Sequence, residues 1–204
     1  MSAAIADFDD QALDAVYEEA LSLHRIDAVT RELLVPLLRV LGERWARAVG
    51  GVAEEHFFSC YLRNKLGARF HHRAARLEGP RVLAACAPGE HHEIGLLLFA
   101  LAAHEAGLRV VLLGADMPFA EIGVAARRAR CDAIVISSSV ESEALGASLS
   151  QLVSGARVPV FIGGATAERQ AEAIRRAGAV ALDTGIEAGA RRVAAELASR
   201  KDAG

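Results

Sequence analysis

The chain has 204 residues, of which 52% are hydrophobic and 24% are charged, and its formal net charge is -3. This length is enough for two small domains or for one larger domain with a buried core. A mildly acidic chain carries no electrostatic footprint for nucleic acid or for an anionic membrane. No apolar stretch approaches the roughly 20 residues of a membrane helix. We therefore expect a soluble protein that binds neither nucleic acid nor membranes directly.

The chain contains three cysteines, Cys60, Cys86 and Cys131. They are widely spaced, odd in number and without a CxxC pair, which favours a reducing interior over a disulfide framework. The first twenty residues are acidic and lack the basic flank and apolar run of a signal peptide. A cytoplasmic location is the resulting expectation.

Residues 9 to 76 show helical periodicity throughout. Asp10 is expected to cap a first helix. A second helix is predicted over about 28 to 48, and Pro36 implies a break or kink at the two residues before it. A third helix follows the next glycine pair. Three or four amphipathic helices joined by short turns predict an antiparallel bundle over residues 1–78.

The pattern changes at Glu78-Gly79-Pro80, the predicted domain boundary. Short apolar runs then alternate with helical stretches, as a parallel sheet covered on both faces requires. The fold class is therefore α/β with an N-terminal all-α module, and residues 79–204 are predicted to form a five-stranded parallel, flavodoxin-like or Rossmann-like sheet. The strands are predicted at 81–86, 109–113, 133–137, 158–162 and 179–182. The helices are predicted near 92–106, 119–130, 142–154, 166–177 and 186–199.

The loop after the first predicted strand reads APGEHHEIG, residues 87 to 95. It brings imidazoles and carboxylates to the strand ends, where such sheets bind ligands. A neutral imidazole binds transition metals, and Glu90 is placed to hold the second ring nitrogen of His92. Gly95 leaves space for a bulky group. A solvated helix start, with Glu90 and Glu93 favoured by the helix dipole, explains this loop equally well. Zinc is a weaker alternative, since no third ligand lies at suitable spacing.

Two further loops carry residues suited to a planar ligand. The third strand ends in Ser137-Ser138-Ser139, and the fourth ends in Gly163-Gly164. Hydroxyls at a strand tip can bond a polar ring edge, and a glycine pair lets backbone approach a flat or phosphate-bearing group. Each is also a common loop composition. A dinucleotide site is disfavoured because the first loop is charged and lacks GxGxxG.

Together these motifs resemble the cobalamin-binding signature of base-off/His-on proteins, usually written DxHxxG, SxL and GG. Methionine synthase, corrinoid methyltransferase subunits and cobalamin mutases share it. The resemblance implies that His92 is the lower axial ligand of cobalt, and that the displaced nucleotide tail inserts past the serines and the glycine pair. Glu90 stands where the signature usually has Asp, which keeps the carboxylate and changes its reach. The matching motifs are Glu90-x-His92-x-x-Gly95, Ser137-x-Ser139 and Gly163-Gly164.

The helical half also carries a resemblance. GERW, ending at Trp45, and the later Glu55-His56 pair are similar to the Trp…Glu-His pattern of the CarH/LitR light-sensing transcription regulators. The similarity covers roughly residues 25 to 200. It implies that Trp45, Glu55 and His56 line the pocket above the corrin, with the indole beside the adenosyl group of adenosylcobalamin. Taken alone, Trp45 on an apolar stripe is typical of a core, and the pair is typical of a solvated surface.

Two features depart from that family. No helix-turn-helix or winged-helix domain precedes the bundle, so either a DNA-binding part is missing from this chain or the sensor acts through a protein partner. Light-sensing relatives often carry a His directly after the Trp, and this position is Ala46. A bis-imidazole photoproduct formed by that route is not expected; water or His56 would take the vacant site.

The resemblance implies an adenosylcobalamin-binding light sensor rather than an enzyme. Loss of the adenosyl group would remove packing against Trp45, shift the bundle and change a homo-oligomer or a partner contact that regulates transcription. The alternative is a corrinoid carrier subunit of a methyltransferase, which a Trp and a Glu-His pair above cobalt would obstruct. A cobalamin-binding antirepressor would share the sensor mechanism. His91 is expected on the loop surface and is the fallback ligand. Surface positions are also expected for His24, His71, His72 and His104.

Overall fold

The computed structural model describes residues 1–45, 49–74, 78–140, 145–182 and 185–202. The side chains of five helix-end residues also lie outside the described part: Trp45, Arg73, Ala74, Leu145 and Asp202. The chain divides into two compact units, Met1–Leu66 and Gly67–Gly204. The predicted boundary after residue 78 marks the change from helix to strand, whereas the last turns of the preceding helix belong with the second unit.

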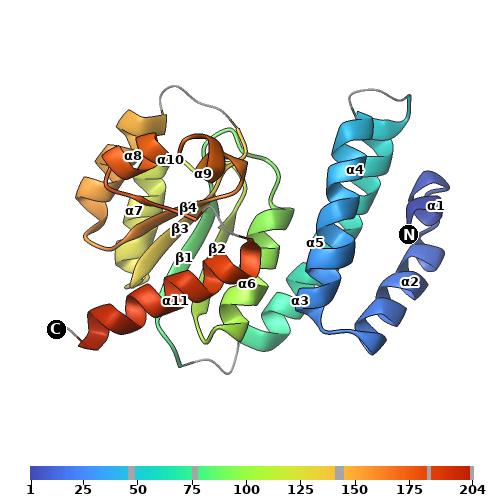
Figure 1. The fold of residues 1–204 in the computed structure, drawn as a ribbon, viewed down its shortest axis with the longest axis horizontal. Helices are drawn as coiled ribbons and strands as arrows, with labels where there is room; N and C mark the ends of the chain where they lie inside the picture. The colour runs from blue at the N-terminus through green and yellow to red at the C-terminus, as the bar shows by residue number, and fades with distance from the viewer. Residues whose placement is uncertain (46–48, 75–77, 141–144, 183–184, 203–204) are drawn as a thin grey trace. The chain divides into compact units, whose positions relative to one another are not determined.

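The first unit is all-helical, as predicted (Figure 1). Its helices bury apolar side chains, among them Leu13, Leu34, Leu41, Phe58 and Leu62. The elements are α1 (Ser2–Ala6), α2 (Asp10–Leu23), α3 (Ile26–Val29), a π-helical turn (Thr30–Leu34), α4 (Val35–Trp45) and α5 (Gly51–Ala74), which continues into the second unit.

One local prediction in this unit is wrong, and the change predicted before Pro36 takes the form of a change in helix type. The residue that caps α2 is Asp9, not Asp10: its backbone is extended and its side chain accepts from the Ala12 N–H at 2.9 Å. Pro36 lies in a continuous helical run, in which the helix type changes between Leu34 and Val35, the two residues at which a break or kink is predicted. A π-helical turn over Thr30–Leu34 precedes it, and this wider turn gives room for a ring that has no N–H and crowds the preceding carbonyls.

A polar cluster joins α2 to α5 in the first unit. The Tyr61 hydroxyl donates to Asp14 Oδ1 at 2.7 Å, and Lys65 Nζ lies 2.5 Å from Asp14 and 2.8 Å from Glu18. The rings of Tyr17 and Tyr61 meet edge to face with centroids 5.8 Å apart. Burial and the bond to Asp14 raise the pKa of Tyr61, so its hydroxyl stays a donor. The cluster therefore fixes the helix that carries the Glu55-His56 pair.

The second unit is a five-stranded parallel sheet in the order β2-β1-β3-β4-β5, which confirms the predicted fold class. Its strands are β1 (Arg81–Cys86), β2 (Arg109–Gly114), β3 (Ala133–Ser137), β4 (Val160–Gly163) and β5 (Val180–Ala181). Its helices are α6 (Ile94–Glu105), α7 (Phe119–Arg128), α8 (Leu145–Ala156), α9 (Ala165–Arg169), α10 (Ala171–Arg176) and α11 (Ile186–Asp202). None of the described helices is long and apolar enough to cross a membrane.

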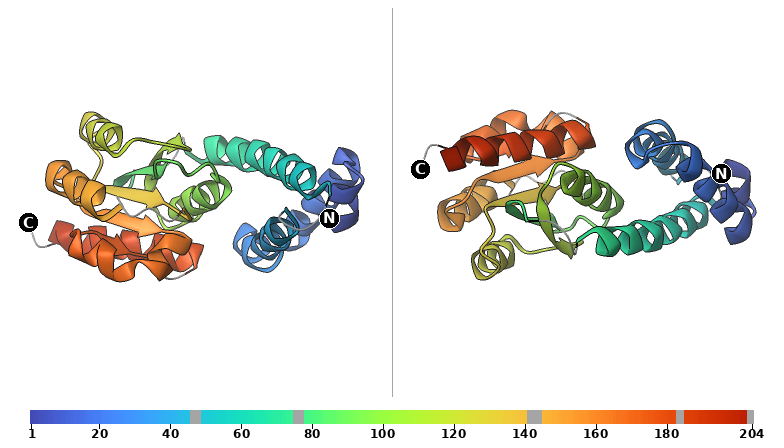
Figure 2. Two further views of the ribbon diagram at one scale, coloured as in Figure 1. Left: turned by 90° about the horizontal axis from the view of Figure 1, so that it is seen from above. Right: turned by 90° about the horizontal axis from the view of Figure 1, so that it is seen from below.

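Helices cover both faces of this sheet, and Figure 2 shows α7 and α11 on opposite sides of it. Alternate residues of each strand feed two cores. Leu83 and Ile134 pack with α7, α8 and α10, whereas Val82 and Phe161 pack with α6 and α11. The chain moves outward from β1 to β2 and then returns past β1 to β3. This reversal places a topological switch point at the carboxyl ends of β1 and β3.

Replacing Tyr61 with Phe tests the polar cluster. The change removes one hydrogen bond to a carboxylate while keeping the ring contact with Tyr17, so we expect the free energy of unfolding to fall by about 1 kcal/mol. Urea unfolding followed by circular dichroism measures it. Cys60→Ser, at an exposed position of the same helix, is the control. Equal stability of both variants and the parent would contradict the role given to the Tyr61 hydroxyl.

Candidate functional site

The strand register brings the three predicted motifs to one edge of the sheet. Cys86, which ends β1, is paired with Ser137, which ends β3. Ser137 is in turn paired with Gly163, which ends β4. The histidine loop, the serine run and the glycine pair thus leave three neighbouring strands side by side. Motifs separated by tens of residues in the sequence lie at the switch point, where a doubly wound sheet binds ligands.

The centre of this edge is the carboxylate of Glu90, which is 1% exposed. Its Oε1 lies 2.7 Å from His92 Nδ1 and accepts from the His92 N–H at 2.9 Å. Its Oε2 accepts from the Ser139 N–H at 2.6 Å and from the Ser139 hydroxyl. The His92 side chain is 77% exposed. Because a carboxylate accepts, Nδ1 carries the proton, and Nε2 keeps the lone pair that can bind a metal.

Charge in this loop follows from burial and hydrogen bonding. Burial raises the pKa of the Glu90 carboxyl, but the hydrogen bonds from Ser139 and His92 outweigh it and hold that pKa below the ordinary 4.5. Beneath the loop, burial raises the pKa of the Cys86 thiol to about 12, with smaller effects of the Glu90 and Glu93 charges. The loop therefore carries a buried anion beside a neutral thiol.

Asp116, which follows β2, holds the histidine loop from the other side. Its Oδ1 accepts from the Gly89 N–H at 2.7 Å, and its own N–H donates to the Glu90 carbonyl at 2.9 Å. Asp116 has a positive φ of 49°, a conformation that Asp tolerates better than most residues. Sequence reasoning missed this residue, because a single Asp after a strand carries no motif.

The three serines have different surroundings. Ser139 bonds Glu90, as described. Ser138 is buried, and its hydroxyl and carbonyl both accept from Thr166, at 3.0 Å each. Ser137 stays in the strand. Gly164 approaches Ser138 so closely that a Cβ would lie 2.5 Å from the Ser138 carbonyl oxygen, and its φ of 86° excludes most side chains. The glycine pair thus lets the ends of β3 and β4 meet.

An apolar cavity of about 160 Å³ opens beside these loops, on the face that α6 and α11 cover. An apolar cavity of roughly this size holds a benzene ring in another protein, at about 150 Å³. A Cβ added to Gly95 would meet no atom within 4 Å. The site therefore combines a polar rim with an apolar slot large enough for a flat group. The cavity is lined by Gly95, Leu96, Phe99, Val135, Ile136, Ser137, Gly163, Gly164, Leu182, Gly185, Ile186 and Gly189.

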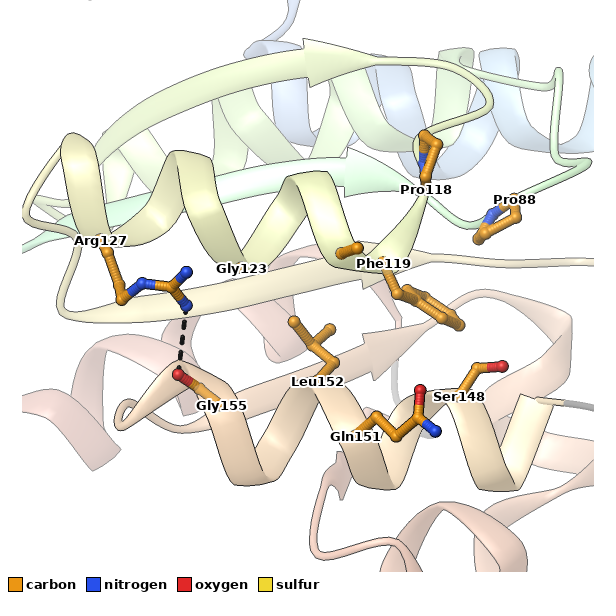
Figure 3. A pocket seen from close by; sticks show the side chains of 10 residues that line it. Pro88, Pro118, Phe119, Gly123, Arg127, Ser148, Gln151, Leu152 and Gly155 are labelled. Carbon is orange, nitrogen blue, oxygen red and sulfur yellow. Dashed lines mark hydrogen bonds between the residues drawn. The ribbon is translucent and has the colours of Figure 1, made fainter.

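A larger hollow of about 450 Å³ lies on the opposite face, between α7 and α8 (Figure 3). Phe119 and Leu152 line it, and Arg127 closes one end with a hydrogen bond to the Gly155 carbonyl at 3.2 Å. Pro88 of the histidine loop lies at its edge, but none of the candidate site residues lines it. We place the candidate site at the smaller cavity, since the convergent polar groups lie there.

The candidate residues of the first unit lie on α4 and α5. His56 Nδ1 is 3.0 Å from the Val52 carbonyl and 3.1 Å from Glu55 Oε2, and Glu55 accepts from the Ser59 hydroxyl at 2.6 Å. Glu55 and His56 are thus paired with each other within one helix. Trp45 ends α4, and its side chain lies outside the described part of the chain, as does Ala46.

Four of the five remaining histidines are exposed, as predicted: His24, His71, His72 and His91. The prediction for His104 is wrong. It is buried, and its ring stacks on Phe70 with centroids 4.6 Å apart, because the end of α5 covers α6 at this point. Among the residues that the structure describes, no group of three or more His, Cys, Asp or Glu could hold a metal ion, so the zinc alternative finds no ligand set there.

Comparison with known proteins gives consistent results for both halves of the chain. The B12 binding domain profile matches residues 80–198, and a second B12 binding domain profile matches residues 1–69. The HTH-type transcriptional repressor CarA of Myxococcus xanthus is 33% identical over 167 residues, which cover 80% of this chain and 56% of that protein. The HTH-type transcriptional repressor CarH of the same organism is 36% identical over 172 residues, covering 82% and 57%.

A solved structure shares the fold. The monomethylamine corrinoid protein of Methanosarcina barkeri superposes with a TM-score of 0.74 at 20% identity, covering 95% of this chain and 94% of that one. The chain spans little more than half the length of the two repressors, so their complete activities do not transfer to it directly. The resemblance expected from the sequence motifs is confirmed.

Replacing Glu90 with Gln tests the buried carboxylate. The amide keeps the shape but can accept at one end only, which leaves a buried donor facing the donors of Ser139 or His92. We expect the free energy of unfolding to fall by about 1–3 kcal/mol, measured by urea unfolding of cofactor-free protein. Glu168→Gln, at an exposed position on α9, should have no effect. Unchanged stability of Glu90→Gln would show that this carboxylate does not organise the loops.

Proposed function

This chain belongs to the B12 binding domain family, and on that premise we propose that it is an adenosylcobalamin-binding light sensor whose response changes oligomer or partner binding to regulate transcription. The observation that carries the proposal is the contact between the buried Glu90 carboxylate and His92 Nδ1, at 2.7 Å. It fixes one imidazole tautomer on an exposed ring. A ring held in this way is suited to donate Nε2 to cobalt as the lower axial ligand.

Glu90 prepares His92 in two ways. The carboxylate accepts from Nδ1, which increases the electron density at Nε2, and it accepts from the His92 N–H, which limits the position of the whole residue. The DxHxxG signature that this loop resembles has Asp at this position. The longer Glu side chain reaches Ser139 on the neighbouring loop as well, so its effect on the imidazole depends on two loops.

The cavity beside α6 and α11 is the proposed place for the cofactor's displaced nucleotide base. It is apolar, it is large enough for an aromatic ring, and Gly95, at which an added Cβ would meet no atom within 4 Å, leaves its rim open. Ser137 adds a polar edge. In this proposal the backbone around the glycine pair faces the nucleotide tail, while Ser138 and Ser139 hold the loop.

The proposal assigns Trp45, Glu55 and His56 to the upper face of the cofactor, on the basis of the resemblance to the CarH/LitR regulators. When bound, adenosylcobalamin supplies a cobalt–carbon bond that light can break. The residues' task is to recognise the adenosyl group, so that its loss changes the packing of the first unit. Ala46 offers no second imidazole, so water or His56 is the expected replacement ligand.

Similarity in sequence supports the sensor over a corrinoid carrier. The relatives at 33% and 36% identity are named as transcriptional repressors, whereas the likeness to the methylamine corrinoid protein, at 20% identity, is a likeness of fold. A carrier must expose cobalt to partner enzymes, which a Trp and a Glu-His pair above the metal would obstruct. That the sensor regulates transcription is proposed from the names of these two relatives.

The first test is the absorption spectrum of the protein mixed with adenosylcobalamin in darkness, before and after green light. We expect a base-off/His-on spectrum that changes on illumination. His92→Ala should lose the His-on form, whereas His91→Ala, the exposed neighbouring histidine, should keep it. A light-insensitive complex without preference for adenosyl over methyl would favour the carrier, and absence of binding would refute both readings.

Replacing Gly95 with Ala tests the cavity. Because a Cβ there meets no protein atom within 4 Å, folding should be unaffected, but the methyl group would occupy space assigned to the nucleotide base. Overpacking of about 1–3 kcal/mol would weaken cobalamin binding roughly 5- to 150-fold. Isothermal titration measures the affinity. Gly146→Ala is the matched control, since Gly146 is also the second residue of its helix and equally unobstructed. Equal affinities would place the base elsewhere.

A further inference from the structure

A residue outside all three motifs contacts the loop after β3, which carries Ser139. Arg169, the last residue of α9, donates from Nη2 to the Ser139 carbonyl at 2.7 Å. The short helix α9 starts directly after the glycine pair, so the end of β4 delivers this side chain to the serine loop. The bond is charge-assisted, and a guanidinium keeps its charge at every physiological pH.

Ser139 is held by side chains on both of its sides. Its N–H and hydroxyl donate to Glu90 Oε2, and its carbonyl accepts from Arg169. Ser138, one residue earlier, is held through its backbone. Its N–H donates to the Gly163 carbonyl, and its carbonyl accepts from the Thr166 N–H. Arg169 and Thr166 belong to the same helix turn. The position of Ser139 therefore depends on α9 as well as on Glu90.

Displacement of Ser139 would reach the histidine through Glu90. Ser139 supplies both of the hydrogen bonds described at Oε2, while His92 occupies Oε1. A carboxylate that is 1% exposed cannot lose these donors without cost, so it would move or take new partners. Either change would alter the contact that orients the imidazole.

We propose that Arg169 is a positioning residue for the His92 ligand, acting through Ser139 and Glu90. The role rests on the proposed function, because it requires His92 to bind cobalt. The loops after β1, β2 and β3 already hold Glu90 and His92. Arg169 adds the segment after β4 to the parts of the fold that position the imidazole. Arg169 does not touch the metal or the imidazole in this assignment.

The test compares Arg169→Met, which keeps the length of the side chain but has no donor, with Arg169→Lys, which keeps one charged donor. Arg176→Met is the matched control, since Arg176 is an exposed arginine paired with Glu172 on α10. With adenosylcobalamin in darkness, we expect Arg169→Met to bind about three- to tenfold more weakly, as loss of one exposed charge-assisted bond implies, and to show a smaller His-on fraction in its absorption spectrum. Arg169→Lys should recover much of the affinity and of the His-on fraction. Arg176→Met should match the parent in both.

Hydrogen exchange of cofactor-free protein supplies the second readout. Peptides containing Ser139 and His92 should exchange faster in Arg169→Met than in Arg176→Met. Parental affinity, spectrum and exchange in Arg169→Met, with the His-on form still lost in His92→Ala, would overturn this role and leave the proposed function standing. If the parent protein bound no cobalamin, the proposed function would fail first, and this role with it. Should Arg169→Met not fold, Arg169→Gln, whose amide is too short to reach Ser139, takes its place.

Discussion

A buried carboxylate must be hydrogen-bonded, and the arrangement of the whole site follows from this requirement at Glu90. The four contacts to its two oxygens come from His92 in its own loop and from Ser139 in the loop after the neighbouring strand β3. They hold the carboxyl in its charged form, orient one imidazole and join two loops. An apolar residue in place of Glu90 would leave both loops without this common partner.

The parallel sheet makes these contacts possible. Because β1, β3 and β4 are adjacent and in register, the residues that follow them emerge at one edge. The order in which strands are added to the sheet reverses at β1, and a crevice forms at such a switch point. Gly164 lets the chain after β4 approach Ser138, and Gly95 leaves the cavity beside these loops open. The same edge therefore provides both a held imidazole and an apolar slot, which is the combination that a cofactor with a displaced base requires.

Local patterns were sufficient for much of this, and long-range contacts account for the remainder. The apolar run of residues 81–86 predicted β1 with its observed bounds, since a buried parallel strand is nearly continuous in apolar residues. The motif could not show that Ser139, rather than its neighbours, reaches Glu90. Nor could it identify Asp116 and Arg169, whose partners lie 27 and 30 residues away in the sequence. The prediction of an exposed His104 is wrong because Phe70, which covers its ring, lies 34 residues earlier in the sequence.

The most direct test of the central claim is electron paramagnetic resonance of cob(II)alamin bound to protein labelled with ¹⁵N in its histidines alone. The axial nitrogen splits each cobalt line into a triplet when it is ¹⁴N and into a doublet when it is ¹⁵N. If an imidazole of this chain replaces the cofactor's own base, labelling converts triplets into doublets, and His92→Ala abolishes the conversion. Triplets that persist in the labelled protein would mean that the cofactor keeps its base, and would contradict the account given for Glu90 and His92.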